Sequence, residues 1–164
     1  MFKLSAKSEA LVVVVGVGNT LFKDEGIGVH IIHELEKLGL PEGVKVFDGG
    51  TSGLSLIDLM KETPRVIFLD AAEMGRKPGT VMRFTPEEVK MASDGNFSLH
   101  EAGLPEVFLL ASFLGVSPDV IIFGIQPKEI GWGIGLSQEL RREVPEIVKV
   151  VLKELGSFDN EEKE

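Results

Sequence analysis

Short runs of aliphatic residues alternate along the chain with segments in which apolar residues recur at helical spacing. Uninterrupted apolar runs of about five residues are typical of parallel strands that are covered on both faces. Strands are therefore predicted at Leu11–Val15, Val44–Phe47, Arg65–Leu69, Gly79–Phe84 and Asp119–Ile125.

The segments between these runs predict helices. In one of them Ile27, Ile31 and Leu35 recur on one helical face. Thr85 and the proline after it form a typical helix start, and Pro145 predicts a break or kink in the last helix. The predicted helices are Gly26–Leu38, Leu54–Lys61, a segment starting at Thr85, Pro105–Leu114 and Ser137–Leu155, and loops are expected at Ala92–Leu99 and Gln126–Leu136.

Strands that alternate with helices predict one three-layer α/β domain over residues 1–156, with a mostly parallel twisted sheet and helices on both faces. The stretch from Leu69 to Gly79 is too short for a crossover helix. The strand Gly79–Phe84 is therefore expected to be antiparallel or to lie at an edge. Residues 157–164 predict an acidic, flexible C-terminal tail.

Composition narrows the range of functions. The 164 residues include no apolar run near the roughly 20 residues of a membrane-spanning helix, and the N-terminus lacks the pattern of a signal peptide. We therefore expect a cytoplasmic protein with no membrane partner. The net charge of −9 disfavours nucleic acid as a partner. Because cysteine is absent, a metal would need His, Asp, Glu or backbone ligands.

Gly16 and Gly18 follow the first predicted strand, a placement that also occurs in dinucleotide-binding proteins. Asp48, at the end of the next strand, could then hold a ribose. However, Leu21 occupies the place of the third glycine, where we expect its side chain to prevent close packing of helix and strand. Asp24 and Glu25 would also repel a pyrophosphate. The two glycines alone also fit a simple turn, so a nucleotide-binding protein is only an alternative and no nucleotide cofactor is expected.

Acidic residues and a histidine occur where strands end or helices begin. Any one of them could simply cap a turn or a helix. Glu25 follows the first strand, Asp70 follows the third, and His100 precedes a helix. Since parallel strands end at a common edge, these three could converge in one solvent-accessible cleft. Two carboxylates and an imidazole could bind nickel, zinc or cadmium.

Five motifs in order resemble the hydrogenase maturation endopeptidases, across roughly Leu11–Leu155. They are GVGNTLFKDEGIG, DGGTSG, FLDA, SLHEAG and FGIQPKEIGWGIGLS. The resemblance implies an aspartic-type peptidase whose substrate is the nickel-loaded precursor of a nickel–iron hydrogenase large subunit. The enzyme would remove the C-terminal extension of that precursor.

The resemblance also implies roles for individual residues. Glu25, Asp70 and His100 match the metal-binding positions, and nickel would arrive with the substrate, although zinc or cadmium could occupy the site. Asp48 matches an aspartate implicated in activity. It, or a carboxylate of Glu25 or Asp70 that is not bound to metal, could steer or deprotonate the attacking water.

The three residues that follow Asp48, namely Gly49, Gly50 and Thr51, are expected to lie along the extended substrate tail. A non-catalytic nickel-binding chaperone for the same precursor would use the same residues. It therefore stays an alternative at this stage.

Overall fold

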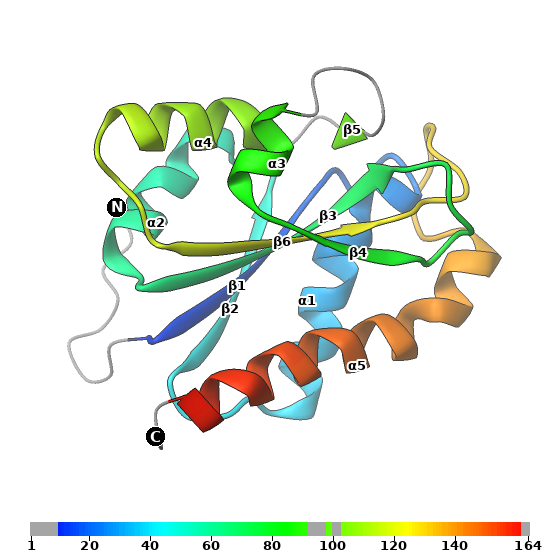
Figure 1. Cartoon of the computed structure of the whole chain (residues 1–164). Helices are drawn as coiled ribbons and strands as arrows, with labels where there is room; N and C mark the ends of the chain where they lie inside the picture. Colours follow the sequence, from blue (N-terminus) through cyan, green and yellow to red (C-terminus); the bar gives the residue numbers. More distant parts are fainter. Residues whose placement is uncertain (1–9, 92–97, 100–102, 162–164) are drawn as a thin grey trace.

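The computed structural model describes residues 10–91, 98–99 and 103–161. Its sheet has the strand order β2-β1-β3-β6-β4, and β5 pairs separately with β3 (Figure 1). The pairs β1–β2, β1–β3 and β3–β6 are parallel, whereas β4 runs antiparallel to β6 at the edge. The strands are β1 (Val12–Val17), β2 (Val44–Gly50), β3 (Arg65–Glu73), β4 (Val81–Phe84), β5 (Ser98–Leu99) and β6 (Asp119–Ile125).

Helices cover both faces of this sheet and complete three layers, as Figure 1 shows. On one face lie α2 (Leu56–Glu62), α3 (Pro86–Met91) and α4 (Leu104–Phe113). On the other face lie α1 (Ile27–Leu38) and α5 (Gln138–Glu161), and two short 3₁₀ helices, η1 (Asp24–Gly26) and η2 (Gly53–Ser55), precede α1 and α2.

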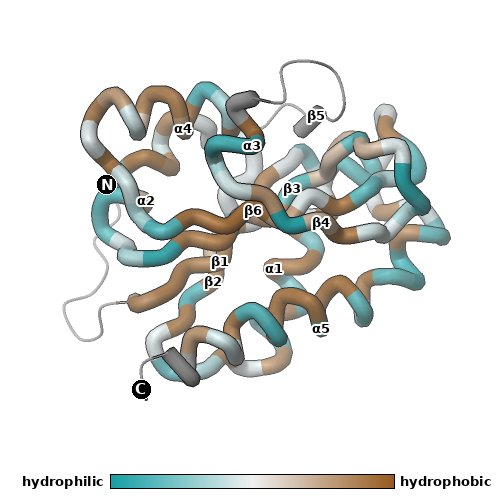
Figure 2. The backbone as a smooth tube through the Cα atoms, viewed as in Figure 1, coloured by the Kyte–Doolittle hydropathy of each residue, from teal (hydrophilic) through white to brown (hydrophobic). Residues whose placement is uncertain are grey.

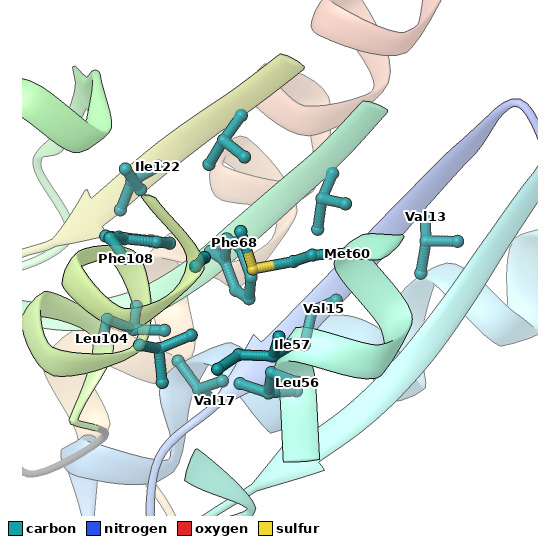
Figure 3. Packing of buried hydrophobic residues seen from close by; sticks show 14 of the residues in the cluster. Val13, Val15, Val17, Leu56, Ile57, Met60, Phe68, Leu104, Phe108 and Ile122 are labelled. Atoms are coloured by element: carbon teal, nitrogen blue, oxygen red, sulfur yellow. The ribbon is translucent and has the colours of Figure 1, made fainter. Parts of the chain in front are cut away.

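Each face of the sheet has its own apolar core. Alternate residues of a strand point to opposite faces, so Val66 and Phe68 of β3 belong to the first cluster and Ile67 and Leu69 to the second. Figure 3 shows the first cluster, in which Phe68 packs against Phe108 of α4 with ring centroids 5.4 Å apart. Because both faces are buried, β1 and β6 are hydrophobic along their length, as Figure 2 shows. The sequence patterns of these strands follow directly from this arrangement.

The closest approach between helix and strand is made by Gly16 of β1 and Gly28 of α1. A Cβ atom on Gly28 would lie 2.2 Å from the carbonyl oxygen of Leu69, and one on Gly16 would lie 2.3 Å from that of Gly28. Only glycine allows this contact. Leu21 is exposed to solvent and takes no part in it, so the expectation that its side chain would prevent close packing is wrong.

The fold class predicted from the sequence is confirmed, including the antiparallel edge strand. Two local predictions are wrong. Helix α5 extends to Glu161 instead of ending at Leu155, and Phe158 packs against the second core. Pro145 lies inside this helix and does not break it, so of the two predicted effects only a kink stays a prediction. Ser98–Leu99, predicted as loop, pairs with β3. Residues 92–97 of that loop and 162–164 of the predicted tail lie outside the described residues.

Within the ranges that the structure describes, no helix combines the length and the apolar character needed to cross a lipid bilayer.

Candidate functional site

The carboxyl ends of β1 and β3 bring Glu25 and Asp70 together. The chain leaves β1 at Val17 and turns through η1, which carries Glu25 and contacts β3. Asp70 lies in β3, one residue beyond Leu69, which is the partner of Gly16 in the β1–β3 register. We refer to Glu25 and Asp70 as the carboxylate pair. The structure therefore unites two of the three residues that the sequence placed in one metal site.

Both carboxylates are buried. Asp70 is 0% exposed and Glu25 is 2% exposed, which differs from the solvent-accessible cleft that we expected. Neither carboxylate oxygen of Asp70 accepts a hydrogen bond of regular geometry from any residue that the structure describes, although the Ala71 backbone amide lies close to the carboxyl group. Burial raises the pKa of Asp70 well above its usual value, the neighbouring Ala71 amide partly offsets this rise, and the charge of Glu25 adds to it.

The residue before Glu25, Asp24, is also buried but is saturated with hydrogen bonds. Its carboxylate accepts hydrogen bonds from the backbone amides of Lys128, Glu129 and Ser137 and from the Ser137 hydroxyl, at 2.7 to 2.9 Å. These bonds fix η1 to the loop that follows β6. Of these two consecutive acids, Asp24 anchors the turn and Glu25 lies near Asp70.

The turn that carries Glu25 also depends on Gly18, which has a φ of +129°. A Cβ atom on Gly18 would lie 2.0 Å from the carbonyl oxygen of Glu25. A side chain at this position would displace η1, and Glu25 with it. Gly18 therefore acts in positioning the carboxylate pair.

Asp48 is not part of this pair. It lies at the end of β2 on the far side of β1 from β3, opposite Gly16, and two strand spacings amount to about 10 Å. Its Oδ2 lies 3.6 Å from Nε2 of His33 on α1, and its Oδ1 accepts the Gly50 amide at 3.0 Å. By strand alternation, Asp70 points to the opposite face, which α2 and α4 cover.

The other predicted positions can be placed only in part. Gly49 and Gly50 end β2 and Thr51 follows as an exposed turn residue. His100 lies outside the described residues. Its neighbour Leu99 pairs with Ala72, two residues beyond Asp70 in β3. Among the residues that the structure describes, no three His, Asp or Glu side chains form a metal site, so the three-residue site stays a prediction.

The carboxylate pair can accept a cation or share a proton. Two buried carboxylates close together cannot both be charged without a compensating positive group. Asp70 has both oxygens available to a cation, and carboxylate oxygens suit divalent ions. This donor set therefore fits the metal that the sequence motifs imply.

Sequence reasoning missed two buried side chains that hold the loops around this edge. One is Asp24, and the other is Gln126 at the end of β6. The Gln126 side-chain oxygen accepts the amides of Met74 and Arg76, while its nitrogen donates to Glu73 and to the Pro127 carbonyl. The only sequence signal for Gln126 is its position directly after a buried strand, and Asp24 has no such signal.

A cavity of about 410 Å³ lies between α1 and α5, and His30 lines it together with Glu34, Leu136 and Arg141. Nε2 of His30 is buried without a partner among the described residues. Burial lowers the pKa of His30, and the positive charges of His33 and Arg141 lower it further, against the opposing effects of Asp24 and Glu34. His30 is therefore partly packed against its neighbours.

Comparison with known proteins gives consistent matches. A family model described as hydrogenase maturation protease matches residues 29–154. The hydrogenase expression/formation protein HupD of Rhizobium leguminosarum bv. viciae is 34% identical over 151 residues, covering 90% of this chain and 75% of that protein. The corresponding protein HoxM of Azotobacter vinelandii is 33% identical over 149 residues, covering 88% and 72%.

Solved structures agree with these matches. The hydrogenase maturating endopeptidase HybD from E. coli has a TM-score of 0.77 and 33% identity, covering 89% of this chain and 92% of that one. The [NiFe] hydrogenase maturation protease HybD from Thermococcus kodakarensis has a TM-score of 0.71 and 26% identity, covering 87% and 97%. The similarity thus extends over the whole α/β domain.

Proposed function

Because the chain belongs to the hydrogenase maturation protease family, we propose that it removes the C-terminal extension from the precursor of a nickel–iron hydrogenase large subunit. The cut is hydrolysis of one peptide bond, and a short C-terminal peptide leaves. Nickel belongs to the substrate, carried in by the precursor. On the sequence grounds given above, we place the reaction in the cytoplasm.

The observation that carries this proposal is the state of Asp70. A buried carboxyl group with no hydrogen bond of regular geometry to either oxygen is costly. Its position at the carboxyl edge of a parallel sheet, beside Glu25, is where α/β proteins bind their ligands. A cation that arrives with the substrate would supply the missing positive charge.

The chain's own residues would then have distinct tasks. Glu25 and Asp70 would hold the metal of the substrate together with His100. A divalent ion at this point can polarise the scissile carbonyl or lower the pKa of a water toward roughly 7. Asp48 is half-exposed at the end of β2. Its Oδ1 accepts a hydrogen bond from the Gly50 amide, and its Oδ2 faces His33. It is our candidate for steering the attacking water. The backbone of Gly49, Gly50 and Thr51 would lie along the substrate tail.

Incubation with nickel-loaded and nickel-free precursor tests the proposal, with the mass of the large subunit measured before and after. We expect a loss of mass equal to a C-terminal peptide from the loaded precursor only. If the loaded precursor binds but keeps its full mass, the protein is a non-catalytic nickel-binding chaperone. Equal cleavage of loaded and empty precursor would show that nickel is not the recognised element.

A further inference from the structure

We infer that an exposed apolar patch beside the carboxylate pair is the docking surface for the folded body of the protein substrate. The patch consists of Leu21, Phe22, Ile130, Trp132 and Ile134. The inference rests on the proposed function, because the occupant is the large-subunit precursor. The docking surface would contact the folded body of the precursor and not the peptide bond that is cut.

The side chains of the patch are strongly exposed. Trp132 is 78% exposed and Ile134 is 87% exposed, while Leu21 and Ile130 are also open to solvent. Phe22 stacks against Trp132 with ring centroids 4.4 Å apart. Single exposed apolar residues need no explanation, but a cluster of large ones marks an interaction site. Tryptophan and other aromatic residues are also enriched among the residues that contribute most to binding between proteins.

Two segments distant in the sequence present these side chains. The segment after β1 and the loop after β6 lie side by side in Figure 1, in blue and yellow. The Lys23 amide donates to the Gly133 carbonyl and the Gly133 amide donates to the Leu21 carbonyl, both at 2.9 Å. An ion pair between Lys23 and Glu129 adds a third connection. We refer to this assembly, with the Asp24 hydrogen bonds, as the loop clasp.

The loop clasp holds the patch in a strained and ordered conformation. Lys23 has a φ of 53°, a region that non-glycine residues rarely adopt, and such strain persists only where surrounding contacts enforce it. Flexible apolar side chains could fold back and cover one another. Here the backbone hydrogen bonds keep Trp132 and Ile134 pointing into water. A surface ordered before binding loses little entropy when a partner covers it.

Position identifies the occupant. Leu21 and Phe22 precede Glu25 by only four and three residues, so the patch adjoins the carboxylate pair. A peptidase that acts on a folded precursor must contact the surface around the scissile segment. The precursor is the one large molecule that the proposed reaction brings to this edge of the sheet. The tail that is cut would lie over the carboxylate pair, and the body of the precursor would cover Trp132 and Ile134.

A single tryptophan makes the docking surface directly observable. Trp132 is the only tryptophan of the chain, so incorporation of 5-fluorotryptophan gives one ¹⁹F resonance. We expect this resonance to shift or broaden when unlabelled nickel-loaded precursor is added. A resonance that stays unchanged at saturating precursor would overturn the inference.

Variants give an independent measurement. Trp132→Ala and Ile134→Ser should each raise the Kd for the loaded precursor by about tenfold or more, while kcat at saturating precursor and the melting temperature stay unchanged. The Ile134 variant leaves the Phe22–Trp132 stack in place. Phe113→Ser is the matched control, because Phe113 is 88% exposed on α4, on another part of the surface. Wild-type affinity in both patch variants would overturn the inference.

The outcomes separate this inference from the proposed function. A precursor that shifts the ¹⁹F resonance but is never cut supports the docking surface and contradicts the peptidase. If both patch variants bind the precursor with wild-type affinity and cut it at the wild-type rate even below saturation, the peptidase is supported and the docking surface is contradicted. If sedimentation shows that the free protein is a dimer that Trp132→Ala dissociates, the patch is an interface between copies and the inference is wrong.

Discussion

Neighbouring residues with the same chemistry carry opposite tasks at this site. Asp24 and Glu25 are both buried acids of η1. Asp24 accepts four hydrogen bonds within the loop clasp, whereas Glu25 lies near Asp70. Asp70 is the reverse case, a buried acid whose oxygens accept no hydrogen bond of regular geometry from the described residues. Proteins retain such costly groups mainly where function requires them.

Replacement of Asp70 should therefore separate stability from activity. Asp70→Ala removes a carboxyl group whose pKa burial has raised, so the free energy of unfolding at pH 7 should stay the same or increase by about 1 kcal/mol. Cleavage of the loaded precursor should fall by about a hundredfold or more. Denaturant titration and the mass assay measure the two effects.

The matched control is Asp58→Ala, which removes an exposed acid of α2. It should change neither the stability beyond about 0.5 kcal/mol nor the cleavage rate. Normal cleavage by a folded Asp70→Ala variant would remove Asp70 from the mechanism.

His30 gives the protein a dependence of stability on pH. Its pKa is lowered in the folded state, whereas the unfolded chain binds the proton with a pKa near 6.5. Below about pH 6.5 the unfolded state therefore binds more protons, and the free energy of unfolding should decrease as the pH falls through the folded-state pKa. His30→Gln should flatten the curve between pH 7 and 5. A difference between wild type and variant that is constant with pH would contradict this account.

At the scale of elements, the loop clasp joins the first and last thirds of the chain. Asp24 receives its hydrogen bonds from residues 104 to 113 positions later. The hydrogen bonds of its carboxylate therefore join two loops that are distant in the sequence. The position of η1, and so of Glu25, depends on this connection.

Asp24→Asn tests the clasp with little change in shape. An amide has one oxygen to accept the hydrogen bonds and adds two donors, so buried backbone amides lose their partner at a cost of about 1–3 kcal/mol. We expect the melting temperature to fall and the ¹⁹F resonance of Trp132 to move even without precursor. Asp58→Asn, in an exposed position, should leave both unchanged. An Asp24→Asn variant as stable as wild type would show that the bonds do not hold the loops.

Local patterns and long-range contacts explain which features the sequence predicts. The β-branched runs of β1 and β3 and the capping residues Thr85 and Glu88, which exchange hydrogen bonds at 2.7 and 3.3 Å, depend only on neighbours in the chain. Asp48 was assigned to the site because its motif resembles that of the family, but a motif does not reveal which face of the sheet a side chain occupies. Likewise, nothing near Asp24 in the sequence indicates that its partners lie beyond β6.

At the scale of the whole molecule, one sheet couples both cores. The two apolar clusters lie on opposite faces of the same strands, since alternate residues of β1, β3 and β6 enter each. If one cluster were lost, one face of the strands would be exposed to water, and these same strands form part of the other cluster. The domain should therefore unfold as one cooperative unit.

Unfolding in guanidinium chloride should show this directly. Far-ultraviolet circular dichroism follows the helices, and Trp132 fluorescence follows the loop clasp. We expect the two midpoints to coincide. If the fluorescence changes at a lower denaturant concentration, the clasp opens as a separate local unit.

The distance in sequence between Asp24 and its partners has a consequence for how the protein is made. During synthesis, β1 and α1 leave the ribosome long before Ser137 exists, so the turn that carries Glu25 stays without its anchor until the loop after β6 has been made. The sheet can begin to assemble from β1, β2 and β3, but the carboxylate pair cannot yet be held in place. We therefore expect a nascent chain that stops before Ser137 to contain the strands around Asp70 but to leave η1, and Glu25 with it, without its anchor.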